Sequence, residues 1–537
     1  MTQRMSVPEF SGNSWFGASV ERQRADLRDF CSRNLQGRQL WLASNRGPYA
    51  WHECEGRLRA ERGQGGLVSA LLALVHQTPT PLHWVASAMT RADARVARQS
   101  GLKRSSAMPE LPLQLSFVTP SRTQYARYYD AIANHILWFV QHNVGVSSSF
   151  PAFDEARWEA WLHGYVAVNR LFARHLTQAV QRSTEAPVFL VQDYHLYLLP
   201  GLLREAFPRA PIAHFTHIAW PGADLWRSLP APIREAILTR LLGADLVGFH
   251  CPRYVQNFLD CCQVLLEVPV DRQRCAISWN GRQVKVRSFP ISVDPSELSR
   301  MAESPEVRAL EHSWLGDRPE RLVAMIARTD PSKNLIRSLL AFETFLARHP
   351  DWQGSVQLLA LLPLSRQSTS AYASHVEDLL HTAARINASW ESPRWKPIDL
   401  HFAHDQAKAI ALLKRYDVLI VNSVADGMNL VAKEGPCLNR RSGVLLLSEC
   451  TGAAQELGPV ARVVNPFDIL GLAEAIHDGL CQPVEVRRHM IREQRAVIAQ
   501  NTIHRWAKDH LRALLAPHEE PEHQTPFAQR HWAHFPE

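Results

Sequence analysis

The chain has 537 residues, of which 46% are hydrophobic and 21% charged, and its formal net charge is +7. This composition excludes an intrinsically disordered chain, and the length exceeds what one hydrophobic core usually serves, so two domains are expected. The positive charge suits anionic partners, but no RNP, zinc-finger or basic-zipper pattern occurs, which favours small phosphorylated molecules over nucleic acid.

The cysteines and the apolar stretches indicate the cellular compartment of the protein. The nine cysteines form no C-x-x-C pair and show no spacing typical of a zinc or disulfide framework, which indicates reduced thiols. No stretch approaches the ~20 apolar residues that span a bilayer, and the first thirty residues lack the apolar core of a signal peptide. We therefore expect a cytoplasmic protein with no membrane partner, and the sequence leaves room for a homo-oligomer.

Short apolar runs that alternate with longer helical patterns follow a polar extension, residues 1–37. Runs of this kind are typical of strands buried on both faces of a parallel sheet. The first series is Gln39–Ser44, Pro187–Gln192, Ile212–Thr216, Leu246–Phe249 and Val284–Phe289. The second series is Leu322–Ala327, Val356–Leu362, Val418–Asn422, Val444–Ser448 and Arg462–Val464. Two such series predict two doubly wound α/β units.

Prolines and charges between Ile291 and Glu320 mark the boundary between the two units. We place the first domain at residues 38–295, the second at 296–485, a helical segment at 486–515 that returns to the first domain, and a polar tail at 516–537. Ligands of open α/β sheets bind beyond the carboxyl ends of the strands. Two facing sheets would therefore form a cleft in which motifs that follow strands meet.

Two motifs of the first domain contain loop glycines or polar residues after strands. Arg46 lies in S-N-R-G-P, and G-Q-G-G, which includes Gly65 and Gly66, precedes a helical run. Glycines at a helix start let a phosphate approach free N–H groups, although such a cluster also fits a simple turn. Asp193 and His217 follow successive strands and could together face a sugar, or be a turn cap and a core histidine.

Aromatic residues on the helical pattern Tyr125–Val140 include Tyr129 and Trp138, and on such a pattern aromatics are more often core than ligand contacts. In the second domain, Arg328 and Lys333 flank a loop that opens a helix and could clamp a diphosphate. The simpler interpretation is a helix start with Asp330 as its cap.

The string D-G-M-N-L-V-A-K-E, from Asp426 to Glu434, is the most specific motif of the second domain. Its Gly-containing turn offers free N–H groups to an anion, and its two outer carboxylates can accept from sugar hydroxyls. A capped helix with an exposed Lys-Glu pair would explain single residues of the string. Arg366 places another cation beyond the preceding strand of the series.

Together these strings resemble the trehalose-6-phosphate synthase family, which is glycosyltransferase family 20. The resemblance extends from about Trp41 to Trp506. It implies a GT-B fold, with two facing Rossmann-like domains and an active site in the cleft between them. It also implies a retaining glucosyltransferase that transfers glucose from a nucleotide-glucose to glucose 6-phosphate and makes trehalose 6-phosphate. UDP-glucose is the commoner donor in that family, and GDP- or ADP-glucose stays open.

The resemblance assigns roles to residues at matching positions. It implies donor binding by Gly65, Gly66, Arg328, Lys333, Asp426, Gly427, Met428, Asn429, Leu430, Val431 and Glu434. It implies acceptor binding by Arg46, Tyr129, Trp138, Asp193 and Arg366. It implies catalytic roles for Asp193, His217, Arg328 and Lys333, with the two cations stabilising the diphosphate as it leaves.

Two observations concern the acceptor and the cofactor. Ser87 stands where the family has a tryptophan, which leaves room for glycerol 3-phosphate or a cyclitol phosphate as the acceptor. No Asp-x-Asp pair occurs in the chain, which fits charge neutralisation by Arg and Lys, and we expect no metal or other cofactor. A nucleotide-sugar-binding protein without activity is the third interpretation, because a fold alone does not determine function.

Overall fold

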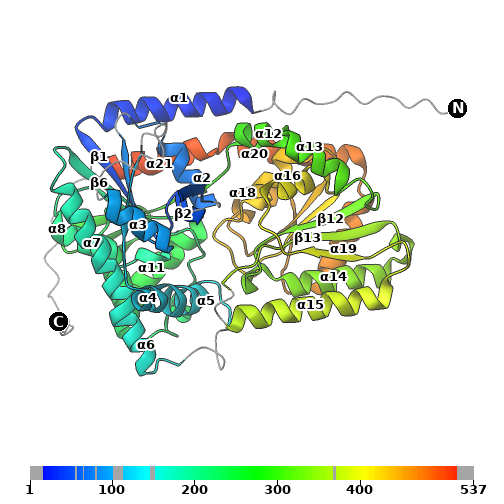
Figure 1. Ribbon diagram of the computed structural model, residues 1–537, viewed down its shortest axis with the longest axis horizontal. Helices are drawn as coiled ribbons and strands as arrows, with labels where there is room; N and C mark the ends of the chain where they lie inside the picture. Colours follow the sequence, from blue (N-terminus) through cyan, green and yellow to red (C-terminus); the bar gives the residue numbers. More distant parts are fainter. Residues whose placement is uncertain are drawn as a thin grey trace.

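The computed structural model describes residues 16–54, 57–63, 66–75, 77–78, 81–100, 113–145, 152–366 and 370–516. These residues form two α/β lobes that lie side by side, with the N-terminal lobe on the left of Figure 1 and the C-terminal lobe on the right. Each apolar run of the sequence overlaps a strand of one of the two sheets, with ends that differ by at most two residues. In the described part of the chain, no helix has the length and apolar character that a membrane crossing needs.

A nine-stranded sheet forms the centre of the N-terminal lobe, in the order β5-β4-β1-β6-β7-β8-β11-β10-β9. Its strands are β1 (Arg38–Ser44), β4 (Leu82–Ser87), β5 (Leu113–Val118), β6 (Ala186–Gln192), β7 (Ile212–Phe215), β8 (Leu246–Phe249), β9 (Val270–Asp271), β10 (Ala276–Trp279) and β11 (Arg282–Ser288). The strands from β5 to β11 are parallel, and β10 and β9 are antiparallel at one edge. Every residue of β7 and β8 is buried, as expected of strands covered on both faces.

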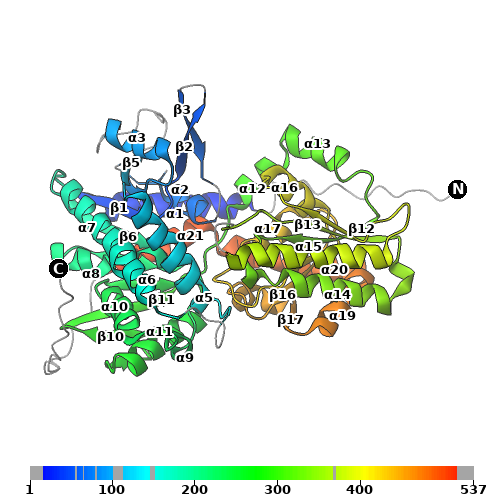
Figure 2. The same ribbon diagram turned by 60° about the horizontal axis from the view of Figure 1, so that its bottom comes forward.

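Helices cover both faces of this sheet, and a hairpin of β2 (Tyr49–Cys54) and β3 (Arg57–Arg62) stands apart from it, as Figure 2 shows. The helices are α1 (Gly17–Asn34), α2 (Gly66–Val75), α3 (Arg91–Ser100), α4 (Arg122–Tyr125), α5 (Trp138–Gln141), α6 (Glu155–Ala160), α7 (Ala167–Val180), α8 (Leu199–Ala206), α9 (Ala223–Trp226), α10 (Ala231–Leu241) and α11 (Pro252–Leu265). Segments Ala126–Leu137 (η1) and Trp161–Val166 (η2) are π-helical, and Tyr194–Leu196 (η3) is a 3₁₀ turn.

The predicted helix over Tyr125–Val140 is confirmed, but most of it has π-helical register. Segments η1 and η2 pack side by side, and Gly164 of η2 faces the backbone of η1 so closely that a Cβ atom would lie 2.6 Å from the Cβ of Arg127. π-helical segments are rare and are frequently found at functional sites. Here η1 carries Tyr129.

The C-terminal lobe contains a six-stranded parallel sheet in the order β14-β13-β12-β15-β16-β17. Its strands are β12 (Arg321–Ile326), β13 (Val356–Leu361), β14 (Ile398–His401), β15 (Val418–Val421), β16 (Val444–Ser448) and β17 (Arg462–Val464). Helices α14 (Leu335–Arg348), α15 (Ser370–Trp390) and α19 (Ile469–Cys481) cover one face. The other face is covered by α12 (Pro295–Ala302), α13 (Pro305–Ser313), α16 (Gln406–Arg415), α17 (Val431–Leu438), α18 (Ala454–Leu457) and α20 (Val484–Gln500). Short 3₁₀ turns are η4 (Pro331–Lys333), η5 (Pro350–Trp352) and η6 (Gly458–Val460).

Both ends of the described chain lie together on the N-terminal lobe. The last helix, α21 (Ile503–Leu515), packs against α1 and α2, as Figure 1 shows along the top of that lobe. Helix α1 has a polar sequence, but Val20, Leu27 and Cys31 recur at helical spacing and are buried on one face. The sequence predicts no element there, because polar and charged residues dominate this segment and its few apolar residues give a weak periodic signal.

Candidate active site

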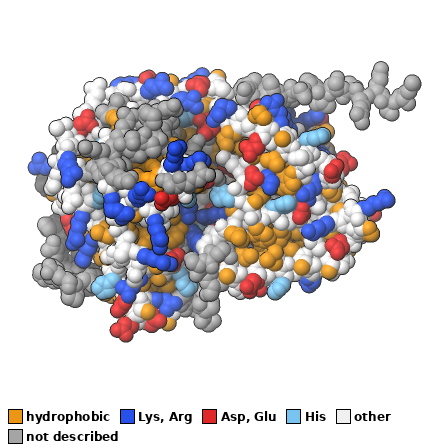
Figure 3. Space-filling model, viewed as in Figure 1, with side chains coloured by type: hydrophobic (Ala, Val, Ile, Leu, Met, Phe, Trp, Pro, Cys, Tyr) orange, Lys and Arg blue, Asp and Glu red, His pale blue; other side chains and the backbone are white. Residues whose placement is uncertain are grey.

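Predicted site residues of both lobes follow the carboxyl ends of strands at the boundary between the lobes. They are Arg46 after β1, Asp193 after β6, His217 after β7, Arg328 after β12, Arg366 after β13 and Asp426 after β15. The lobes touch here, because the hydroxyl of Tyr254 donates to the carbonyl of Asp426 at 2.6 Å. Figure 3 shows Lys and Arg side chains in a shaded hollow between the lobes. The strand ends of the two sheets thus supply one shared site.

The loop after β12 holds the two predicted clamp cations against carboxylates. Arg328 pairs with Asp330 at 2.8 Å, and its side chain is 53% exposed, whereas Asp330 is fully buried. Lys333 forms an ion pair with Asp426, which reaches it from the loop after β15. Asp330 makes no capping hydrogen bond, so the interpretation of this residue as a helix cap is wrong. Arg328 is therefore oriented by its partner and still accessible to an anion.

Asp426, in the loop after β15, is a charged hydrogen-bond acceptor beside Lys333. Burial alone would raise the pKa of Asp426, but the Lys333 ammonium and the neighbouring donors outweigh burial and lower it below the ordinary value. The carboxylate also accepts from Ser423 Oγ at 3.1 Å and from Asn429 Nδ2 at 3.0 Å. A small pocket beside it is lined by Lys333, Ser423, Asn429 and residues of β12 and β15. A polar ligand there would meet a fixed negative charge.

The turn after Asp426 packs directly on the N-terminal lobe. A Cβ atom at Gly427 would lie 2.1 Å from the carbonyl oxygen of His217, so the close approach of the two backbones requires glycine. The other members of the motif follow in order: Met428 is buried, Asn429 has a φ of 76°, Leu430 precedes α17 and Val431 begins it. Their backbone therefore runs along the boundary between the lobes.

The end of the motif does not form an exposed charge pair. Lys433 is 1% exposed, and its ammonium donates to Glu456 at 2.6 Å and to the carbonyl of Ile291 at 2.8 Å. No ion pair involves Glu434 in the described part of the chain, and burial raises the pKa of its carboxyl to about 7. The exposed Lys-Glu pair of the simpler interpretation is therefore wrong. Lys433 ties the C-terminal lobe to the segment between the lobes, a role that the motif did not indicate.

Asp193 adopts a strained backbone conformation at the end of β6. Its φ of 73° and ψ of 167° fall in a region that is essentially restricted to glycine and that costs of order 1–3 kcal/mol. Its carboxylate accepts from the backbone N–H of His217 at 3.1 Å. Burial raises the pKa of Asp193 to about 6, against the opposing effect of this hydrogen bond and of nearby Arg366. Strain of this kind is commonly kept where a side chain has a functional task.

His217 is a neutral histidine beside Asp193. Burial, together with the neighbouring His250, His510 and His214, holds its pKa well below the ordinary value. Its Nε2 donates to the side-chain oxygen of Gln192 at 2.9 Å, which leaves Nδ1 as the acceptor of the ring. The aspartate and the histidine thus occupy one corner of the site, as their matching positions after strands predicted.

The four predicted phosphate-binding residues come together from both lobes. Arg46 lies 3.3 Å from the hydroxyl of Tyr129. Arg366 lies over the ring of Trp138, 5.1 Å from its centroid, and pairs with Asp330 at 3.3 Å. Trp138 is only 1% exposed, and its buried ring packs against the Arg366 guanidinium. The group forms a basic corner near Asp193.

Tyrosines that the sequence did not single out complete this corner. The hydroxyl of Tyr194 lies 3.2 Å from Arg366 Nη2, and the hydroxyl of Tyr372 lies 2.8 Å from its Nη1. Tyr194 is adjacent to Asp193 in the Q-D-Y-H string and could have been noticed there. Tyr372 lies on α15 with no motif around it. Of the glycine cluster, Gly66 begins α2 and Gly65 lies outside the described residues.

Comparison with known proteins identifies the chemistry of these lobes. The sequence profile of glycosyltransferase family 20 matches residues 38–516. The chain is 31% identical to the UDP-forming alpha,alpha-trehalose-phosphate synthase of Botryotinia fuckeliana, over 89% of this chain and 88% of that one. It is also 30% identical to the validamine 7-phosphate valienyltransferase of Streptomyces hygroscopicus subsp. jinggangensis, over 90% of this chain and 96% of that one.

Solved structures of similar proteins have the same architecture. The E. coli trehalose-6-phosphate structure bound with UDP-2-fluoro glucose matches with a TM-score of 0.76 and 26% identity, over 89% of this chain and 99% of that one. The UDP-forming trehalose-phosphate synthase of Burkholderia xenovorans in complex with glucose-6-phosphate matches with a TM-score of 0.74 and 27% identity, over 89% and 99%. The predicted GT-B fold class is confirmed.

Proposed function

The chain belongs to glycosyltransferase family 20 and is a glycosyltransferase, and from that premise we propose that it transfers glucose from UDP-glucose to glucose 6-phosphate. The products are α,α-trehalose 6-phosphate and UDP. The observation that carries the proposal is the pair of cations after β12, Arg328 and Lys333. They lie next to the basic corner around Arg46 and Arg366, because Asp330 pairs with both Arg328 and Arg366. We place the reaction in the cytoplasm.

The cations suit the charge that develops in this reaction. Breaking the bond between glucose and phosphate builds positive charge on the anomeric carbon and negative charge on the departing diphosphate. Preorganised cations at the diphosphate are therefore worth more in the transition state than in the ground state. Arg328, held by Asp330 yet half exposed, and Lys333 would supply this stabilisation without a metal ion.

We propose a front-face route with retained configuration. The leaving phosphate oxygen would take the proton of the attacking hydroxyl, so no covalent intermediate forms. Asp426 would accept from the hydroxyls of the donor glucose, with His217 beside it, and Glu434 would accept from the ribose hydroxyls. The backbone from Gly427 to Val431 and the glycines at the start of α2 would enclose the donor. These residues then position the donor, whereas Asp193 would orient the acceptor.

The identity of the acceptor has an alternative to glucose 6-phosphate. Four side chains able to bind a phosphate favour a phosphorylated acceptor, and the glucose-6-phosphate complex of the similar Burkholderia protein supports glucose 6-phosphate. The similar validamine 7-phosphate valienyltransferase favours a cyclitol phosphate as the second candidate. Ser87, at the end of β4, is buried, and its hydroxyl has no hydrogen-bond partner among the described residues. Because serine is much smaller than tryptophan, it leaves space that the family's tryptophan would fill. Glycerol 3-phosphate would also fit the phosphate receptors.

A matrix of donors and acceptors tests the proposal. UDP-, GDP- and ADP-glucose are each combined with glucose 6-phosphate, glycerol 3-phosphate and validamine 7-phosphate, with and without a chelator. We expect the highest kcat/KM for UDP-glucose with glucose 6-phosphate, unchanged by the chelator, and an α,α-linked product by NMR. A higher kcat/KM for another pair would contradict the substrates. Activity lost in chelator and restored by magnesium or manganese would contradict neutralisation by Arg328 and Lys333.

Glu434→Gln is expected to stabilise the free protein and to weaken donor binding. Because burial raises the pKa of Glu434 from 4.5 to about 7, the folded state binds more protons than the unfolded state between these values. The free energy of unfolding therefore falls as pH rises from 4.5 to 7. Above pH 7 the charged carboxylate destabilises the folded state by up to about 3 kcal/mol, at about 1.4 kcal/mol per unit of pKa shift. Gln removes that cost but loses a carboxylate acceptor.

Thermal unfolding and kinetics at several pH values measure both effects. We expect the variant to gain apparent Tm over wild type at pH 8 but not at pH 4.5, and its KM for the donor to rise. Glu485→Gln is the matched control, since that side chain is 74% exposed at the start of α20. A Tm difference that does not depend on pH would contradict the raised pKa, and an unchanged KM would contradict the ribose contact.

A further inference from the structure

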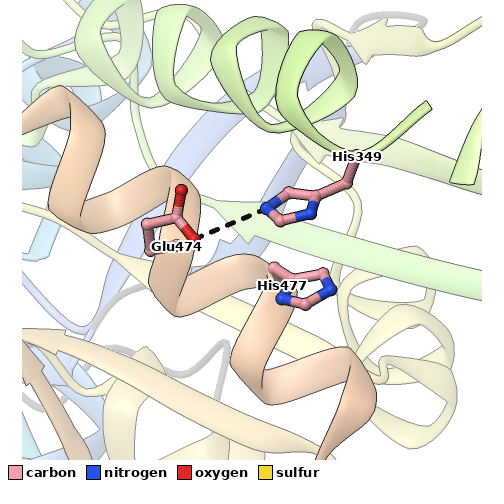
Figure 4. Close-up of side chains that lie close together, drawn as sticks. All are labelled: His349, Glu474 and His477. Atoms are coloured by element: carbon pink, nitrogen blue, oxygen red, sulfur yellow. Dashed lines mark ion pairs between the residues drawn. The ribbon is translucent and has the colours of Figure 1, made fainter.

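A group of potential metal ligands lies on the C-terminal lobe, away from the strand ends that form the active site. His349 directly follows α14, and Glu474 and His477 lie on α19, as Figure 4 shows. Helix α14 starts next to the clamp residue Lys333 and has 14 residues, so its far end lies roughly 20 Å from the clamp at 1.5 Å per residue. The group therefore cannot take part in glucose transfer.

The three side chains already converge. One ligand atom from each lies within 4.8 Å of the others. His349 Nε2 is buried and lies 3.5 Å from a carboxylate oxygen of Glu474, and it makes no well-aligned hydrogen bond to any of the described residues. The rings of His349 and His477 stack with centroids 3.7 Å apart and an angle of 5° between their planes. A buried nitrogen without a well-made hydrogen bond calls for a partner, and a bound ion would be such a partner.

A thiol extends the group to four. Cys481 Sγ lies 3.4 Å from His477 Nε2. Glu474, His477 and Cys481 are separated by three and four positions along α19, so they share one face of the helix. The spacing of cysteines along the chain gave no sign of a zinc framework, because the other ligands are two histidines and a carboxylate and one of them comes from another helix.

We propose that His349, Glu474, His477 and Cys481 bind a transition-metal ion, with Zn²⁺ as the best-suited ion. Imidazole, thiolate and carboxylate are the ligands of zinc, whereas Ca²⁺ and Mg²⁺ require oxygen ligands and would find one carboxylate here. Two nitrogens bound to one Zn²⁺ at about 2.0–2.1 Å lie roughly 3–3.5 Å apart, and the ion lies in the plane of each ring, so one of the two stacked rings must turn out of the parallel arrangement when the ion binds. The other oxygen of Glu474 accepts from Arg348 at 2.5 Å, and this bond would orient the carboxylate.

The site would join the far ends of α14 and α19. Their near ends are already joined, because Asn334 Nδ2 donates to the carbonyl of Pro466 at 2.6 Å and Arg337 lies over the ring of Phe467. A metal ion would close the other end of the same helix pair. Since the helix that follows the clamp would then be fixed at both ends, the ion stabilises the C-terminal lobe and leaves the chemistry unchanged.

Metal titration of the full-length chain, without a histidine tag and with its thiols reduced, tests this site. We expect one saturable Zn²⁺ site by calorimetry and a rise in apparent Tm of about 2 °C or more at saturation. Bound Co²⁺ should show a thiolate charge-transfer band that Cys481→Ser abolishes. His477→Ala should weaken Zn²⁺ binding by more than about 100-fold, because even outer partners of a metal ligand contribute about 10–100-fold.

The matched control is His489→Ala, an exposed histidine on the next helix, which should bind Zn²⁺ as wild type does. Zn²⁺ binding that survives His477→Ala, or no saturable site in the wild type, would overturn the proposal, and a missing charge-transfer band would remove Cys481 from it. His477→Ala should keep the turnover of wild type, and its loss would overturn the separation from catalysis. Because binding and Tm are measured without substrate, these outcomes are independent of the proposed glucosyl transfer.

Discussion

Lys333→Ala is expected to lower kcat/KM by roughly 100-fold or more, which corresponds to about 3 kcal/mol of lost transition-state stabilisation. In the proposed mechanism, the lysine is one of two cations that neutralise the departing diphosphate. It also pairs with Asp426. Burial would raise the pKa of that carboxyl, and the Lys333 ammonium does most to lower it. Its removal therefore takes away a positive charge and loosens the acceptor for the donor glucose. Steady-state kinetics with UDP-glucose and glucose 6-phosphate measures the loss.

Two further measurements separate a catalytic effect from damage to the fold. Lys396→Ala is the matched control, because that lysine is 54% exposed and pairs with Asp399 on the same lobe. It should retain wild-type kinetics. In Lys333→Ala the pKa of Asp426 should rise, so residual donor binding should weaken as pH falls, unlike in wild type. Near-normal turnover in a folded Lys333→Ala protein would remove the clamp from the mechanism.

The central strands could be predicted from sequence because they are buried on both faces and consist of continuous apolar runs. The strands that sequence analysis did not identify include edge strands. In β14 only Ile398 is buried, and β9 has two residues, one of them exposed. Edge strands are short and polar in order to avoid pairing with other chains, which removes the apolar signal. The hairpin of β2 and β3 stands outside both main sheets and follows the same rule.

Site residues could be predicted where they follow strands, since parallel strands bring their carboxyl ends to one edge. Partners that come from elsewhere could not. Tyr372 reaches Arg366 from a helix whose sequence has no motif, and Asp330 resembled a helix cap although it is a buried counter-ion of two arginines. A buried charge that pairs with two cations depends on the three-dimensional arrangement and leaves no trace in local spacing.

Gly427→Ala is expected to lower kcat/KM by at least about 100-fold, although it adds a single methyl group. The new Cβ atom would lie 2.1 Å from the carbonyl oxygen of His217 and 2.8 Å from its carbonyl carbon. These are backbone atoms of the other lobe, so no side-chain rotation relieves the overlap, and the turn must move away. The shift displaces Asp426, and a misplacement of about 1 Å at a reacting group costs about 100-fold.

The control substitution is Gly458→Ala, in which the new Cβ atom meets its nearest neighbour at an ordinary 3.6 Å on the same lobe. We expect this variant to have the kinetics and Tm of wild type. Gly427→Ala should remain folded by circular dichroism, because the overlap lies at the boundary between the lobes and both cores are intact. Since the overlap separates the lobes, the KM values for donor and acceptor should rise together. A folded Gly427→Ala protein with wild-type kinetics would show that the lobes do not approach as closely during catalysis. It would contradict the placement of Asp426 and His217 in one shared site.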